Sequence, residues 1–135
     1  MNRHPYLRAY MAGVLLPSWF LLIVLAGFVI GRLVYQIPVP IERVIVFPMA
    51  VIPNLWGIWN VLYLATSARH RVTVGAWGAL LPLILVPSGV FLERLLELSL
   101  FTPLEALIAV PVIAAVYYLI WKHAVSFLNN VAGVN

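Results

Sequence analysis

The sequence predicts an all-α membrane protein, built as a four-transmembrane-helix bundle with proline-kinked spans. Three observations predict this class. First, 64% of the 135 residues are hydrophobic, only 9% are charged, and the mean hydropathy is +1.06, whereas soluble domains carry about 25% charged residues. Second, four apolar stretches are close to the ~20 residues that a helix needs to cross the ~30 Å hydrocarbon core. Third, every stretch contains a proline, which removes a backbone hydrogen bond and bends a helix.

The predicted spans form one integral membrane domain, residues 1–135. Their approximate bounds are 10–31, 44–66, 72–92 and 104–121. Gln36 to Pro40 contains two prolines and therefore predicts a tight turn after the first span. Thr102 and Glu105 have the spacing of a capping box, and Pro103 stands at the first helical position, so together they predict where the fourth helix begins.

The distribution of basic residues predicts the orientation of the spans, because short cytoplasmic loops carry the excess of Lys and Arg. One side of the membrane receives Arg3, Arg8, Arg69, His70, Arg71, Lys122 and His123. On the other side, the basic residues Arg32, Arg43 and Arg94 are diluted by Glu42, Glu93, Glu97 and Glu105. Both termini are therefore predicted to be cytoplasmic, and we expect a multi-pass protein of the bacterial inner membrane. Arg69, His70 and Arg71 are also candidates for contact with lipid headgroups.

Small residues recur on one face of the first, third and fourth spans. Apolar helices in lipid pack through such residues because small side chains let two backbones approach closely. The predicted packing residues are Gly13, Gly27, Gly31, Gly75, Gly78, Gly89 and Ala115. Gly27 and Gly31 also form a GxxxG pattern, which is typical either of packing within the chain or of a self-association face.

The second span carries an unusual stretch, VIPNLWGIWN, from Val51 to Asn60. Pro53 frees the backbone carbonyl of Met49, and the amide of Asn54 can bond to a carbonyl freed in this way. The carboxamide of Asn60 also needs partners in an apolar medium. It therefore predicts either an interhelical hydrogen bond or a small polar cavity between helices.

Charged residues near the far side of the membrane add to that second possibility. Glu93 and Glu97 are one helical turn apart with Arg94 beside Glu93, which is typical of an interfacial ion-pair cluster but also of a cation or proton path. Arg32 either extends to the headgroups or pairs with one of these glutamates. The candidate polar pocket consists of Asn54, Trp56, Asn60, Tyr63, Arg32, Glu93 and Glu97.

Residue usage argues against several classes of chemistry. The chain has no cysteine and no aspartate, and its histidines, His4, His70 and His123, all fall at predicted cytoplasmic ends. We therefore predict no catalytic residue, no metal site and no cofactor. The basic residues are too few and too scattered to predict nucleic-acid binding.

The sequence thus favours a small integral membrane interaction or scaffold protein, acting as a homo-oligomer or as a subunit of a larger membrane complex. Its expected partners are membrane lipids and either itself or another membrane protein. One alternative is a small-solute or ion transporter or channel, with a path lined by polar residues of the second and third spans. A second alternative is a lipid-modifying enzyme that uses His70 or His123 at the cytoplasmic face.

Overall fold

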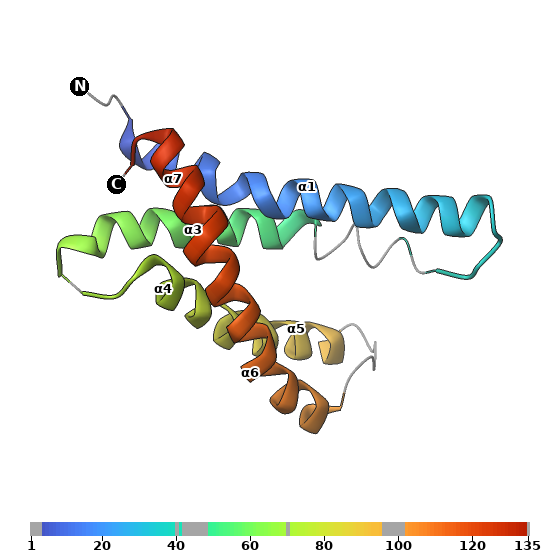
Figure 1. The fold of residues 1–135 in the computed structure, drawn as a ribbon. Coiled ribbons are helices and arrows are strands. Elements are labelled where there is room, and N and C mark those ends of the chain that lie inside the picture. The colour runs from blue at the N-terminus through green and yellow to red at the C-terminus, as the bar shows by residue number, and fades with distance from the viewer. Residues whose placement is uncertain (1–3, 40, 42–48, 70, 96–101, 135) are drawn as a thin grey trace. The chain divides into compact units, whose positions relative to one another are not determined.

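The computed structural model describes residues 4–39, 41, 49–69, 71–95 and 102–134, with Glu93 described by its backbone alone. Within these ranges all regular secondary structure is helical, as the sequence predicts (Figure 1). The chain divides into two compact units. Unit 1 comprises Met1–Thr66 and Leu128–Asn135, and unit 2 comprises Ser67–Phe127.

Unit 1 is built on two long helices, α1 (Pro5–Leu33) and α3 (Ala50–Thr66), which run side by side in opposite directions (Figure 1). The two helices approach closely at Gly13 and Gly57. A Cβ atom on Gly13 would lie 2.6 Å from the carbonyl oxygen of Trp56, and one on Gly57 would lie 2.6 Å from the ring of Tyr10. Glycine at both positions therefore brings the two backbones together, as close packing in lipid requires.

The predicted packing residues in the second half of α1 have fewer described neighbours than we expected. A Cβ on Gly27 would have no described atom within 4 Å, and one on Gly31 would only touch Val39, at 3.8 Å. Gly13 lies beside Gly57 of α3, which is described from Ala50 onward, whereas residues 42–48 are outside the described ranges.

Unit 2 contains two short helices, α4 (Val74–Leu80) and α5 (Pro82–Leu95), followed by the longer α6 (Pro103–Ile120). The predicted third span is thus divided at Leu81, before Pro82, which has no N–H to donate. The α4 glycines pack against the end of α6. A Cβ on Gly75 would lie 3.0 Å from the Cβ of Lys122 and from the ring of Tyr118.

The last helical segment does not end near residue 121, as expected, but continues to Ala132. The segment η3 (Trp121–Val125) is a single π-helical turn, in which the N–H of Ser126 reaches back to the carbonyl of Trp121. It leads directly into α7 (Ser126–Ala132). Lys122 and His123 therefore lie inside the helix, so these two basic residues do not mark its C-terminal end.

The face that α6 and η3 present to α4 also differs from the predicted one. Gly78 packs against Trp121, whose side chain is fully buried, whereas Ala115 is exposed and a Cβ on Gly89 would have no described atom within 4 Å. The bulky indole sets the contact and turns Ala115 away from it. The small-residue pattern predicted which face of α4 is packed, but it did not predict which residues of α6 and η3 pack against that face.

Three of the described helical segments are long and apolar enough to cross a membrane, namely Pro5–Leu33, Val74–Leu92 and Pro103–Ala132. These segments indicate a membrane protein. Helix α3 has 17 described residues, and the first part of the predicted second span lies in the undescribed segment 42–48. The structure therefore supports three of the four predicted spans.

The predicted start of α6 is confirmed. The Thr102 hydroxyl accepts from the N–H of Glu105 at 3.3 Å, and the Glu105 carboxylate accepts from the N–H of Thr102 at 2.9 Å. Two backbone donors at the helix start are thus satisfied by the capping box.

Replacing Thr102 with alanine should lower the free energy of unfolding by about 1 kcal/mol, because the side-chain acceptor for the N–H of Glu105 is lost. Thermal unfolding of the purified protein in detergent, followed by circular dichroism, measures the change. Thr102→Ser keeps the hydroxyl and serves as the control. Equal midpoints for the two variants would contradict a capping role.

Candidate functional site

The most distinctive polar feature of the described residues is a buried pair of asparagines in unit 1. Asn60 on α3 is 1% exposed and Asn129 on α7 is 3% exposed. Asn60 Nδ2 donates to Asn129 Oδ1 at 2.7 Å, and Asn129 Nδ2 donates back to Asn60 Oδ1 at 3.0 Å. Asn60 Nδ2 also donates to the backbone oxygen of Ala9 on α1, at 2.7 Å. One carboxamide therefore joins three helices of unit 1.

The local structure around Asn129 explains how it reaches this position. Trp121, Val125 and Asn129 follow one another at intervals of four residues along the continuous helix, and all three are buried. After Asn129 the helix ends in a Schellman motif, since Val134 N–H donates to the carbonyl of Asn129 and Gly133 has a φ of 65°. Gly133 takes the left-handed conformation without the cost that a Cβ imposes.

Sequence reasoning missed Asn129 because the fourth span was predicted to end at Trp121. The signal that could have found it is the four-residue spacing of Trp121, Val125 and Asn129, which continues past Lys122 and His123. Such a spacing places Asn129 on the same face as Trp121, and a buried asparagine on one helix calls for a partner such as Asn60 on another.

A second polar contact in unit 1 involves Asn54. The hydroxyl of Tyr10 donates to Asn54 Oδ1, and Asn54 Nδ2 donates to the carbonyl of Ala50 at 2.8 Å. We expected a carbonyl freed by a proline, such as that of Met49, as the acceptor. The structure selects the neighbouring carbonyl four residues before Asn54, because a side chain on a helix reaches the preceding turn. Tyr10 was not predicted as a partner.

The structure describes only some of the other members of the predicted pocket. Trp56 is buried and Tyr63 is half-buried, both on α3. Arg32 is exposed at the far end of α1, about 35 Å along the helix axis from Ala9 by the rise of an α-helix. The side chain of Glu93 and all of Glu97 lie outside the described part of the chain. The described residues thus join Asn60 to Asn129 and not to Arg32.

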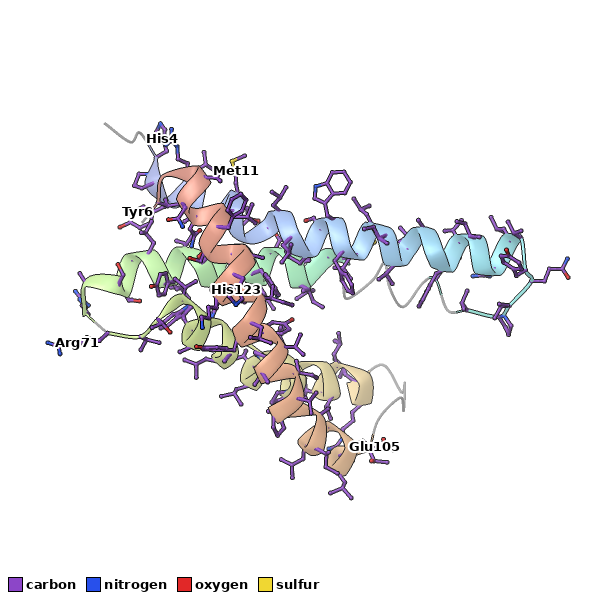
Figure 2. The ribbon with its side chains drawn as sticks, viewed as in Figure 1. His4, Tyr6, Met11, Arg71, Glu105 and His123 are labelled. Carbon is purple, nitrogen blue, oxygen red and sulfur yellow. The ribbon has the colours of Figure 1, made fainter. Side chains whose placement is uncertain are left out.

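The predicted cytoplasmic cluster is described only in part. Arg69, in the short helix η2 (Ser67–Arg69), and Arg71 are exposed, and Figure 2 shows Arg71 extending away from the chain. His70 lies outside the described ranges. His123 is exposed in η3, and among the described residues no group of three or more His, Asp or Glu side chains could hold a metal ion.

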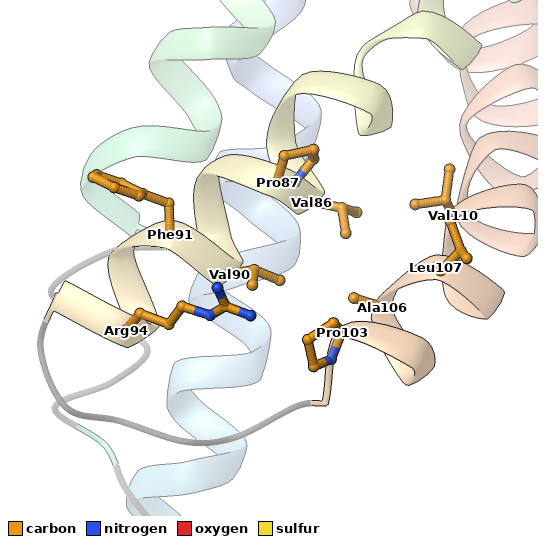
Figure 3. Close-up of a pocket in the computed structure, with 9 residues that line it drawn as sticks. All are labelled: Val86, Pro87, Val90, Phe91, Arg94, Pro103, Ala106, Leu107 and Val110. Carbon is orange, nitrogen blue, oxygen red and sulfur yellow. The ribbon is translucent and has the colours of Figure 1, made fainter.

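Two apolar grooves each contain a single arginine. In unit 1, a groove of about 410 Å³ between α1 and α7 includes Arg8, whose guanidinium donates to the carbonyl of Ala132 at 3.3 Å. In unit 2, a groove of about 330 Å³ between α5 and α6 includes Arg94 (Figure 3). Its lining is completed by Val86, Pro87, Val90, Phe91, Pro103, Ala106, Leu107 and Val110. Sequence reasoning found neither groove, because each depends on how two helices diverge.

Comparison with known proteins does not identify the chain further. No protein family matches it, and no curated protein or solved structure is significantly similar to it. Its function must therefore be argued from the residues themselves.

Proposed function

We propose that the chain is a small integral membrane interaction protein, which acts as a homo-oligomer or as a subunit of a larger membrane complex. The observation that carries the proposal is the closed state of Asn60. A transport path through Asn60 requires its carboxamide to face water, whereas this carboxamide is 1% exposed and bonded to Asn129 and Ala9. Its geometry is that of an interhelical hydrogen bond, which stabilises helix packing in lipid.

The contacts of the chain ends support a four-span topology. Arg8 at the start of α1 bonds to Ala132 at the end of α7, and Asn60 joins both helices. The first and last helices therefore have their outer ends at the same place, which favours an even number of membrane crossings. We infer that α3 is a fourth crossing beside the three apolar segments. Basic residues at this end favour the cytoplasm for both termini, in a bacterial inner membrane.

A large apolar surface remains available for partners. In the segment Pro103–Ala132, only 6% of the most apolar window is buried. Leu104, Leu107, Ile108 and Val112 of α6 are all more than half exposed. Lipid chains or the helices of a partner can cover such a surface. The surface that this protein offers to a partner is therefore apolar and suited to the interior of the membrane.

The GxxxG face of α1 provides the test. Gly27 and Gly31 form a GxxxG pattern, and we expect this pattern to form a self-association face. Gly27→Leu should weaken self-association about tenfold, because overpacking costs about 1–3 kcal/mol and 1.4 kcal/mol changes an affinity tenfold. Subunit counting by single-molecule photobleaching in lipid vesicles measures the effect.

The matched control is Ala26→Leu, which adds the same side chain at an exposed position one residue away. It should leave the oligomeric state unchanged. A wild-type protein that is monomeric in vesicles and co-purifies with no other membrane protein would overturn the proposed function itself. An oligomer that Gly27→Leu leaves intact would overturn only the choice of face.

A further inference from the structure

The groove between α5 and α6 is apolar along its walls and charged at one end. Val90 and Phe91 on α5 and Ala106 and Leu107 on α6 contribute only hydrocarbon surface, and Arg94 is the only charged residue among the described residues that line the groove. Figure 3 shows the Arg94 side chain extending from α5 toward the α6 side of the groove. At about 330 Å³, the volume lies within the range of ligand sites, about 300–1,000 Å³.

The charged end of the groove lies where α5 ends and α6 begins. Arg94 stands in the last turn of α5, and Pro103 is the first residue of α6. From Arg94, the groove extends back along α5 to Val86, about 12 Å deeper by the helical rise. The cationic end therefore lies at the ends of two membrane helices, where headgroups are found, and the apolar part lies toward the hydrocarbon core.

This arrangement matches the polarity of one class of ligand. A guanidinium binds phosphate through paired hydrogen bonds and stays charged at every physiological pH. Apolar walls offer no partner to a free inorganic anion beyond that one contact, but they suit an acyl chain. A neutral zwitterionic lipid adds its own cation beside the phosphate, which weakens the attraction to an arginine. The complement of the groove is therefore an anionic lipid.

We propose that the α5–α6 groove binds an anionic phospholipid, with one acyl chain along Val90 and Leu107 and the phosphate on the guanidinium of Arg94. In this arrangement, the contact with Arg94 selects lipids whose headgroup is negatively charged. The bound lipid fills the space between α5 and α6, and every described lining residue belongs to unit 2.

Photolabelling of the full-length protein in vesicles tests the site. The probes are phosphatidylglycerol and phosphatidylcholine that carry the same photoactivatable acyl chain, and mass spectrometry locates the label. Wild-type protein should be labelled on α5 and α6 by phosphatidylglycerol more than by phosphatidylcholine. Arg94→Gln should reduce the phosphatidylglycerol signal about fivefold, as expected for one arginine near a membrane surface, and Arg94→Lys should retain part of it.

Arg32→Gln is the matched control, because it removes the same charge from the end of a helix in unit 1, outside the groove. It should leave the labelling of α5 and α6 unchanged. Equal labelling by the two lipids in the wild type would overturn the proposal whatever the variants do. Labelling that Arg94→Gln does not reduce, or that falls equally in Arg32→Gln, would also overturn it.

Discussion

Replacing Gly78 with alanine should destabilise unit 2 more than the same change at Gly75 or Gly89. A Cβ at this position would lie 2.0 Å from Cγ and 2.4 Å from Cβ of Trp121. Those atoms are close to the Trp121 backbone, so the indole cannot swing aside by turning its outer end. Overpacking of this kind typically costs about 1–3 kcal/mol, and we expect a loss near the upper end of that range.

Gly89→Ala is the matched control for this experiment. It adds the same methyl group to a helix of the same unit, at a position where no described atom lies within 4 Å. Alanine is favoured over glycine inside a helix by roughly 0.5–1 kcal/mol, so this variant should be slightly stabilised. Denaturant unfolding in detergent, followed by circular dichroism, measures both. Similar midpoints for Gly78→Ala and Gly89→Ala would show that α4 does not pack on Trp121.

Replacing Asn60 with leucine should lower the stability of unit 1 by about 2 kcal/mol, because the buried amide of Asn129 loses its partner and an unsatisfied buried group costs about 1–3 kcal/mol. The membrane moderates this cost, since an unfolded helix in lipid also finds partners. Asn129→Leu should have a similar effect. The double variant should lose less than the sum of the two, because no polar partner is then left alone.

The same variants separate packing from transport. In reconstituted vesicles, Asn60→Leu protein that remains folded should pass solutes and ions as the wild type does. A double-mutant cycle in which the two losses simply add would contradict the reciprocal pair. A specific flux that is present in the wild type and absent in Asn60→Leu would instead favour the transporter alternative.

Some features of the fold could be predicted because they depend on neighbouring residues alone. The capping box needs only Thr102 and Glu105 three positions apart, and the apolar stretches follow from hydropathy. The close packing at Gly13, Gly75 and Gly78 was also on the predicted faces. In each case a local pattern and a general property of helices in lipid were sufficient.

Other features depend on residues that are far apart in the chain. Asn60 was recognised as needing a partner, but the choice of Asn129, 69 residues later, follows from a helix that continues through a π-turn. That turn carries one extra residue and shifts the helix phase, so no regular wheel predicts which face reaches α4. The grooves depend on the divergence of two helices, which a single sequence pattern does not encode.

The pairing of Asn60 with Asn129 has a consequence for how the protein is made. The ribosome produces residue 60 long before residue 129, so the first helices enter the bilayer while the Asn60 carboxamide still lacks its final acceptor. Unit 1 is therefore completed last, although its first helix is synthesised first. Until α7 has been synthesised, α1 and α3 pack without the contact that Asn129 provides.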